Sequence, residues 1–257
     1  PTMVKAALPA LAPEVPADPG TLKHLYQIMH LGRVLDDKAP NYLKQAVGWS
    51  YHAPCAGHDG IQLALGLSFR AGKDYLFPYY RDLLTCLAAG LTPLEIILNG
   101  ISKKDDPSSG GRHMSNHFGK PEIGIQNVSS LTGNHTQHAT GLGRAVKHYG
   151  SDAVVFSSQG ESSLSEGYCY EAIVGADKEK LPVVFVIQDN GYGISVPKRD
   201  QAANEHLCDN FAGLPNLRIV KCDGLDVMDS LRAMNESIAY AASGAGPSRR
   251  RRPSPRS

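Results

Sequence analysis

The sequence contains 257 residues, of which 42% are hydrophobic and 20% are charged, the balance of an ordinary globular protein. This length suits one large α/β domain or two small ones, and the composition excludes a mainly disordered chain, a collagen and a coiled coil. No apolar stretch approaches the roughly 20 residues that a membrane-spanning helix needs, so we expect no membrane segment.

The net charge of +1 hides an uneven distribution along the sequence. The last ten residues, SRRRRPSPRS, hold five of the 26 basic residues, so the remainder carries 21 basic against 25 acidic residues. A mildly acidic body gives no support for nucleic-acid binding, although the Arg-rich tail by itself leaves open the binding of nucleic acid or of acidic surfaces. The five cysteines include no Cys-x-x-Cys pair, which favours free thiols in a reducing compartment.

The first half of the sequence predicts helices followed by one long loop. Helical periodicity covers residues 21–47 and 60–69. A further helix begins at Thr92, because Thr92 and Glu95 have capping-box spacing. Residues 102–135 are rich in Ser, Gly, His and Asn, which predicts a long loop with a functional role. The apolar residues expected to share one side of the first helix are Leu22, Leu25, Ile28, Met29 and Val34.

The second half alternates short β-branched runs with helical patterns, which predicts an α/β fold with a parallel sheet and right-handed crossovers. The predicted elements are a helix beginning at Thr136, strands over 153–156, 183–187 and 218–222, and helices over 164–176 and 227–242. The side chains of the first of these helices that we expect to face inward are Leu142, Val146 and Tyr149.

Polar side chains follow two of the predicted strands at the point where each strand ends. Glu161 comes after the first strand, and Asn190 comes after the second. Carboxylate and amide oxygens suit Mg²⁺ or Ca²⁺, and ligands of parallel sheets bind beyond the carboxyl ends of the strands. The small residues Gly160, Ser162 and Ser163 precede a helix, whose first N–H groups can bind an anion. The pattern therefore predicts a metal-bridged diphosphate site.

The same residues resemble the thiamine diphosphate motif, which opens with Gly-Asp/Glu-Gly and closes with Asn-Asn. Glu161 and Asn190 lie 29 positions apart, close to the separation of about 30 residues between the two ends of the motif. The residues that follow, Asn-Gly-Tyr-Gly-Ile-Ser, restrict the resemblance to one family of thiamine enzymes. The sequence is similar to the alpha subunit, or the alpha half of a fused form, of the decarboxylating component of 2-oxo acid dehydrogenase complexes of the branched-chain or pyruvate type. Further matching segments are 56–62, 79–82, 111–114 and 129–130.

The resemblance implies a set of ligands for the cofactor and its metal. Mg²⁺ would be held by Glu161, Asn190 and the backbone carbonyl of Tyr192. Tyr80 would contact the cofactor, and Arg81 would pair with a diphosphate oxygen. The other residues assigned by the resemblance are Ser130, Ser162, Ser163 and Gln188 in the diphosphate pocket, and Ser129 and Asn134 near a K⁺ ion.

The resemblance also implies a fold, a reaction and partners. Residues 20–243 would form a thiamine diphosphate-binding domain, with helices on both faces of a parallel sheet. The reaction would be oxidative decarboxylation of a 2-oxo acid, with acyl transfer to the lipoyl group of a partner acyltransferase. The glutamate that activates the cofactor would come from a beta subunit in an α₂β₂ assembly, so this chain offers only His113 and His117 as catalytic candidates. We expect the protein in the bacterial cytoplasm, or in the mitochondrial matrix of a eukaryote.

Several positions depart from the family pattern. Ser162 replaces the last Gly of the opening, and Asp189 replaces the first Asn of the close. Gln188 stands where the branched-chain type has an Arg near the diphosphate, so phosphate binding is weaker here unless another cation substitutes. Residues 1–19 read as an extended leader, and the tail over 244–257 reads as disordered. Because the family continues into a loop with a substrate-facing His, we expect a truncation or a shifted reading frame at this tail.

Other interpretations remain open. The alternatives are half of another thiamine enzyme, such as an acetoin dehydrogenase or a transketolase-like enzyme, and a non-catalytic remnant that binds a partner. A zinc site at the pairs His113/His117 or His135/His138 is disfavoured, since no cysteine or paired carboxylate joins them. A nicotinamide site at Gly141-x-Gly143 is disfavoured because the motif lies within a helical pattern.

Overall fold

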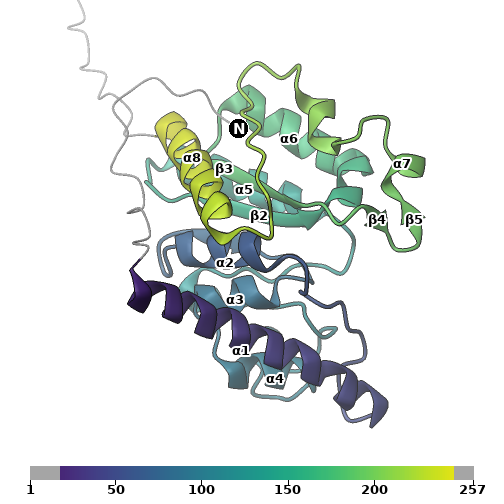
Figure 1. Cartoon of the computed structure of the whole chain (residues 1–257). Helices are drawn as coiled ribbons and strands as arrows, with labels where there is room; N and C mark the ends of the chain where they lie inside the picture. The colour runs from purple at the N-terminus through teal and green to yellow at the C-terminus, as the bar shows by residue number, and fades with distance from the viewer. Residues whose placement is uncertain (1–17, 246–257) are drawn as a thin grey trace, which may run out of the picture.

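The structure is a computed structural model that describes residues 18–245 (Figure 1). The predicted leader over 1–19 and the predicted tail over 244–257 lie almost wholly outside the described residues. Within residues 18–245, no helix combines the length and the apolar character that crossing a bilayer requires.

Four helices form the N-terminal part: α1 (Pro19–Lys44), α2 (Asp59–Ser68), α3 (Leu83–Ala89) and α4 (Pro93–Gly100). Local sequence explains where two of them begin. The Asp18 carboxylate accepts the backbone N–H groups at the start of α1, and Thr92 and Glu95 form the predicted capping box at the start of α4. The helices predicted over 21–47 and 60–69, and the helix start at Thr92, are therefore confirmed.

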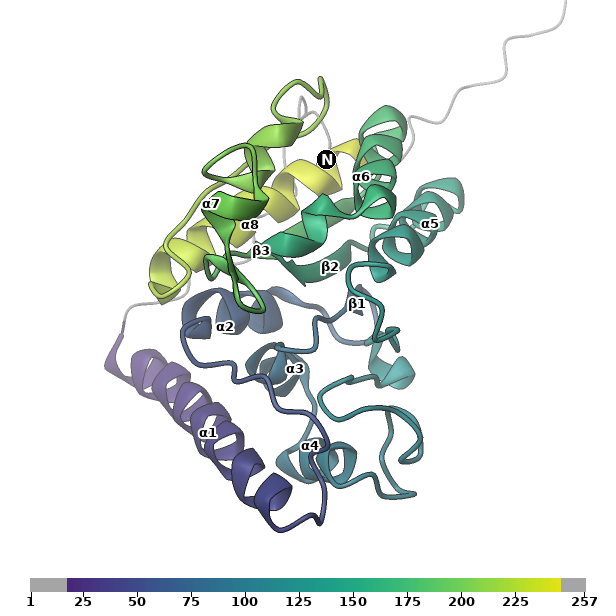
Figure 2. The same ribbon diagram turned by 90° about the vertical axis from the view of Figure 1, so that its right-hand side faces the viewer.

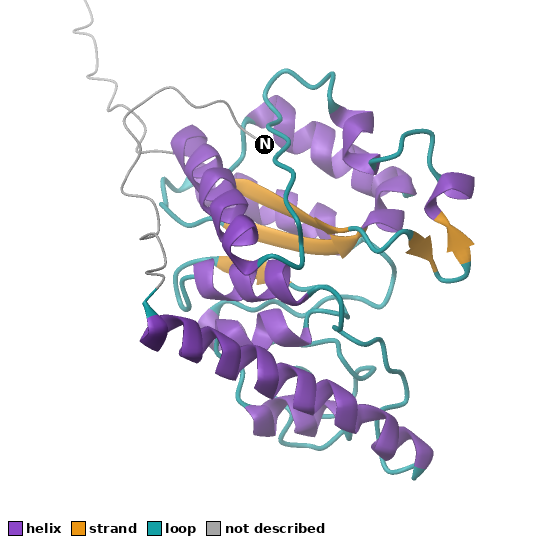
Figure 3. Ribbon diagram, in the orientation of Figure 1, coloured by secondary structure: helices purple, strands orange, loops and turns teal. Residues whose placement is uncertain are grey.

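The central sheet has three parallel strands in the order β1–β2–β3: β1 (Tyr75–Phe77), β2 (Val155–Gly160) and β3 (Val183–Gln188) (Figure 3). The register pairs Gly160 with Gln188, so β2 and β3 end side by side. Both of the strands predicted in this region are confirmed, and β2 extends beyond residue 156 to Gly160.

The strand predicted over 218–222 is wrong. Ile219–Cys222 lines the same cavity as the β3 residues Val184–Ile187, but the segment forms no ladder with β3 and is not a strand. The third strand is instead β1, which comes from the N-terminal half and pairs with β2. A run of three residues is too short to show the alternation by which a strand is recognised in a sequence.

Helices cover both faces of the sheet, which confirms the predicted fold class (Figure 2). Because side chains alternate along a strand, Phe156, Val184 and Val186 point into the core shared with α2, α3 and α8 (Val227–Ala245). The β2 residue Val155 and the β3 residue Val183 belong to the core on the opposite face. That core is covered by α5 (His135–His148) and α6 (Gly167–Glu179).

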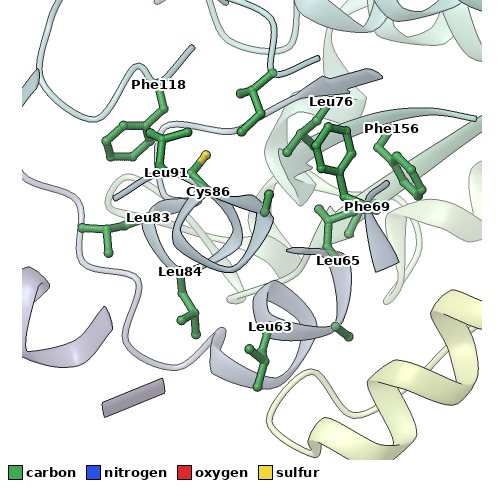
Figure 4. Close-up of a cluster of buried hydrophobic side chains, with 14 of the residues drawn as sticks. Leu63, Leu65, Phe69, Leu76, Leu83, Leu84, Cys86, Leu91, Phe118 and Phe156 are labelled. Atoms are coloured by element: carbon green, nitrogen blue, oxygen red, sulfur yellow. The ribbon is translucent and has the colours of Figure 1, made fainter. Parts of the chain in front are cut away.

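The larger core lies between the sheet and the N-terminal helices. Leu65 of α2 and Phe69 at its end lie near Leu76 and Phe156 (Figure 4), and Leu63 points from another side of α2 into the same core. Leu25 is buried in this core, but Leu22 and Val34 are exposed, so only part of the predicted apolar side of α1 faces inward. Val146 of α5 is buried as predicted, and Leu142 packs against the same core. Tyr149 is 82% exposed, because it follows the last residue of α5.

Short elements connect the strands to the helices at the carboxyl edge of the sheet. The 3₁₀ helix η2 (Glu161–Ser165) directly follows β2. After β3 the chain forms a small hairpin, β4 (Tyr192–Gly193) and β5 (Val196–Pro197), then α7 (Lys198–Gln201) and η3 (Leu207–Phe211). The loop predicted over 102–135 contains only the short η1 (Pro121–Ile123). These connections place polar side chains around the ends of β2 and β3.

Candidate functional site

The structure brings Glu161 and Asn190 together at the carboxyl ends of β2 and β3. The backbone N–H of Asn190 points to Oε2 of Glu161 at 3.4 Å. This contact follows from the register, because Gly160 and Gln188 are paired and each chain then leaves the sheet at the same edge. The two strand ends therefore meet as the sequence led us to expect, and the metal-binding role of the two residues remains a prediction.

Glu161 is buried, and its second carboxylate oxygen has no partner. The residue is 2% exposed, and Oε1 is a buried atom without a hydrogen bond among the described residues. Burial raises the pKa of Glu161, the neighbouring Asp189 carboxylate adds to that rise, and Lys198 opposes it. A buried carboxylate oxygen without a partner is costly, so the site fits a cation that would pair with Oε1.

Asn190 and Tyr192 form a tight turn between β3 and the β4–β5 hairpin. Oδ1 of Asn190 accepts the backbone N–H of Tyr192 at 2.9 Å, and Gly191 takes a positive φ of 80°, which glycine adopts readily. The described residues contain no cluster of three His, Cys, Asp or Glu side chains suited to a metal. A site here would thus combine one carboxylate with amide, backbone and non-protein oxygens, a donor set typical of Mg²⁺.

A cavity of about 600 Å³ opens beside these strand ends. Its lining includes Glu161, Asn190, His58 and Lys198 from four different segments. This volume lies in the usual range for small-molecule sites. The cavity also reaches between β3 and the unpaired segment 219–222. We call the part lined by Glu161, Asp189, Asn190 and Lys198 its polar end, because these side chains lie where the strands end.

Tyr80 and Arg81 lie in an aromatic cluster on the turn between β1 and α3. The Arg81 guanidinium lies 5.7 Å from the centre of the Tyr79 ring and 5.5 Å from that of Tyr80, and Nη1 donates to the carbonyl of Pro54 at 3.1 Å. Its Nε is buried without a hydrogen bond among the described residues. The guanidinium therefore keeps an unused donor for an anion.

The two histidines predicted as catalytic candidates belong to this cluster. The rings of His113 and His117 stack at 4.6 Å, and His117 also stacks with Tyr80 at 6.3 Å. Nδ1 of His113 is buried without a partner in the described part of the chain. The arrangement places both imidazoles near the predicted cofactor residue Tyr80, and a catalytic role for them remains a prediction.

The predicted serines occupy three different environments. Ser130 is exposed, and it lines a cavity of about 10 Å³ together with Tyr80, His117 and Ser129, which is space for about one water molecule. Ser162 donates to Oε1 of Gln201 at 3.0 Å and is half-buried. Ser163 is buried, with 1% exposure. Asn134, which was predicted to lie near a K⁺ ion, has its Oδ1 buried without a partner among the described residues.

Gln188 lies inside a buried hydrogen-bond network. Its Nε2 donates to Oδ1 of Asp82 at 2.5 Å and to Oγ of Ser158 at 2.8 Å. Its Oε1 accepts from Nε2 of Gln62 at 2.9 Å. The two N–H groups of this amide are therefore used within the protein, which leaves none of them for a diphosphate in this arrangement.

The same network fixes the turn that carries Tyr80 and Arg81, and its roles were not foreseen from the sequence. Oδ2 of Asp82 accepts the backbone N–H of Tyr79 at 2.7 Å, and Gln62 donates to the carbonyl of Arg81 at 3.0 Å. Gln62 and Asp82 lie in segments 56–62 and 79–82, which match the family. That match was the one feature of the sequence that could have indicated a role for them at the site. Only the fold reveals that they meet at the end of β3.

Two buried histidines near the strand ends make the folded state sensitive to acid. Burial lowers the pKa of His135 and of His58 to about 4 each. Nε2 of His135 lies 2.7 Å from the carbonyl oxygen of Ser158, and since a carbonyl only accepts, this nitrogen carries the proton of the neutral ring. His135 Nδ1 has no partner in the described residues.

We expect stability to fall as the pH drops from about 6.5 towards 4. The folded state holds both rings neutral, whereas the unfolded chain protonates them near the ordinary histidine pKa of about 6.5. The contribution is therefore fully present above pH 6.5 and is lost below it. Urea unfolding at a series of pH values would measure this loss, and His135→Gln should reduce the slope; an unchanged slope in that variant would contradict the role of His135.

The sheet, its covering helices and the polar cavity at its carboxyl edge define an α/β domain with a candidate ligand site at the strand ends. Comparison with known proteins identifies the family. Residues 26–248 match the family described as dehydrogenase E1 component. Because the match covers most of the sequence, the chain belongs to this family.

Individual relatives agree with this assignment. The chain is 32% identical over 225 residues to the 2-oxoisovalerate dehydrogenase subunit alpha of Bacillus subtilis, a match that covers 87% of this chain and 67% of the relative. It is 32% identical over 230 residues to the pyruvate dehydrogenase E1 component subunit alpha of Staphylococcus aureus, covering 88% and 58% respectively.

A third relative is the 3-methyl-2-oxobutanoate dehydrogenase subunit alpha of Mycobacterium tuberculosis. It is 30% identical over 229 residues, which cover 88% of this chain and 58% of the relative. The chain thus spans 58–67% of the length of these three relatives. The resemblance noted from the sequence, to an alpha subunit of the branched-chain or pyruvate type, is confirmed.

Proposed function

We propose that this chain is an alpha subunit of a 2-oxo acid dehydrogenase and binds thiamine diphosphate through Mg²⁺ at the ends of β2 and β3. The observation that supports this most directly is the meeting of Glu161 and Asn190, with a carboxylate oxygen of Glu161 buried and unpartnered. Glu161, Asn190 and the Tyr192 carbonyl would hold the metal. When bound, thiamine diphosphate would supply the nucleophilic carbon that allows a 2-oxo acid to lose CO₂.

The residues of this chain would then anchor and orient the cofactor. Arg81, with its unused Nε donor, would contact an anionic oxygen, while the network of Gln62, Asp82 and Gln188 holds the turn that carries Arg81. The Tyr80 ring, packed against Tyr79 at 4.1 Å, would limit access of water from that side. These roles concern binding and orientation of the cofactor. The glutamate that activates the cofactor would come from a beta subunit, as the resemblance implies.

The partners follow from the same proposal. We propose a beta subunit that completes the site in an α₂β₂ assembly, and a lipoyl-bearing acyltransferase that accepts the acyl group. The names of the relatives support a 2-oxo acid of the pyruvate or branched-chain type as substrate. The proposed location is the bacterial cytoplasm, or the mitochondrial matrix if the source is a eukaryote; a K⁺ ion near Ser129 and Asn134 is also part of the proposal.

Calorimetric titration with thiamine diphosphate and Mg²⁺ of the full chain in complex with its beta partner tests the proposal. We expect the wild-type chain to bind, and Glu161→Ala or Asn190→Ala to weaken binding by more than about tenfold, because each removes a metal contact. Glu122→Ala is the matched control, since Glu122 is an exposed carboxylate on η1. Equal affinities of the wild type and both site variants would contradict the proposal.

A further inference from the structure

The polar end of the large cavity contains two acidic side chains. Glu161 and Asp189 both line it where the strands end. A diphosphate entering here would meet both carboxylates, even with a divalent cation between them. The site therefore requires a protein cation close to these two residues.

Neither Gln188 nor Lys221 meets that requirement, and Arg81, which we place on an anionic oxygen of the cofactor, is not among the residues that line this cavity. The amide of Gln188 is neutral, and its N–H groups are used by Asp82 and Ser158. Lys221 lines the cavity, but its ammonium pairs with Asp209 at 2.9 Å and its side chain is 53% exposed. Among the described residues that line the cavity, the other ammonium is that of Lys198.

Lys198 is positioned at the strand ends by the hairpin that follows β3. The chain leaves β3, forms the β4–β5 hairpin and returns, so that the backbone N–H of Lys198 donates to the carbonyl of Gly191 at 2.8 Å. Nζ then lies 2.5 Å from Oδ2 of Asp189, with 19% of the side chain exposed. The side chain of Lys198 is thus more covered than the 53% exposed side chain of Lys221, and its ammonium is held at the cavity by an ion pair.

The ammonium also has donors to spare. A lysine carries three N–H donors, and Asp189 is the one hydrogen-bond partner of Nζ among residues 18–245. Asp189 therefore orients the ammonium and leaves it able to donate to a further oxygen at the cavity.

We propose that Lys198 is a binding residue for the diphosphate group, donating from Nζ to a phosphate oxygen while Asp189 holds the side chain in place. This inference rests on the proposed function, and it assigns the cation that Gln188 does not provide. The alternative role for Lys198 is to neutralise Asp189 without touching the ligand. The two roles differ in what happens when both charges are removed together.

The test uses the full chain in complex with its beta partner. Titration calorimetry measures its affinity for inorganic pyrophosphate with Mg²⁺ and for thiamine diphosphate with Mg²⁺. We expect Lys198→Met to weaken both about tenfold, because it removes a charge-assisted hydrogen bond. Lys198→Arg should recover most of the affinity. Lys221→Met is the matched control for the second lysine of the cavity, and we expect it to bind like the wild type.

The double variant Asp189→Asn/Lys198→Met separates direct contact from charge neutralisation. We expect it to bind as weakly as Lys198→Met. Asp189→Asn alone should bind at least as well as the wild type, because its amide oxygen can still accept from Nζ of Lys198 while one negative charge is removed. Recovery of wild-type affinity in the double variant would overturn the proposal, as would an equal loss in Lys221→Met or no loss in Lys198→Met. Thermal unfolding of each variant identifies loss of folding, in which case Lys198→Gln replaces Lys198→Met.

Failure of this inference is distinguishable from failure of the proposed function. A wild-type chain that binds neither probe removes the basis for both. A wild-type chain that binds both probes, with unchanged binding in Lys198→Met, overturns only the role of Lys198.

Discussion

Asp82→Ala is expected to lower the free energy of unfolding by about 3 kcal/mol or more, because it leaves several buried donors without an acceptor. Asp82 is wholly buried at 0% exposure. Its carboxylate accepts from Gln188 at 2.5 Å, from the Tyr79 backbone at 2.7 Å and from Thr85 at 3.2 Å. Burial raises the pKa of Asp82, and these donors oppose that rise, so the carboxylate depends on the network around it.

Urea unfolding followed by circular dichroism would measure this loss. Asp105→Ala is a suitable control, since Asp105 is exposed and its removal should change stability by less than about 0.5 kcal/mol. We also expect Asp82→Ala to loosen the Tyr79–Arg81 turn, which the network joins to β3. Equal stabilities of the Asp82 and Asp105 variants would show that the network contributes little to folding.

Trp49→Ala is expected to destabilise the protein by about 3–5 kcal/mol, the usual range for removing a large aromatic side chain from a core. Trp49 is the only tryptophan of the sequence, and it is 1% exposed. Its indole stacks on Tyr42 at 5.5 Å and donates to Oδ1 of Asn116 at 3.0 Å. The variant would lose the aromatic contacts and leave the Asn116 oxygen without its donor.

The packing around this tryptophan supplies a matched pair of glycine variants. A Cβ atom on Gly100 would overlap the Trp49 ring, whereas a Cβ atom on Gly141 would meet no atom within 4 Å. Both glycines lie in helices, so alanine at 141 should be neutral or stabilising and alanine at 100 should cost about 1–3 kcal/mol. Thermal unfolding of the two variants would measure the difference, and equal melting temperatures would contradict the close contact.

The parts of the fold that were predictable from the sequence are those specified by neighbouring residues. The apolar runs of β2 and β3 and the cap at Thr92 each lie within a few positions, and all three are present in the structure. The two predicted strands also indicated that Glu161 and Asn190 lie close together, because the carboxyl ends of neighbouring parallel strands lie at the same edge of a sheet. Local pattern was therefore sufficient to find the candidate metal residues.

The parts that could not be predicted depend on contacts between distant segments. Gln62 and Gln188 are 126 positions apart, and no local pattern shows that one binds the other. The strand expected over 218–222 has the composition of a strand, but a ladder requires alignment with β3 that composition does not determine. Lys198 lies close to Glu161 only because the hairpin turns the chain back towards the sheet.

The ion pair of Asp189 and Lys198 also constrains how this site can change during evolution. The two residues are nine positions apart and are joined at 2.5 Å. Loss of the lysine alone would leave an uncompensated carboxylate beside Glu161, and loss of the aspartate alone would release the ammonium from its orientation. Related chains should therefore keep or exchange the two positions together, so that they are inherited as a single unit.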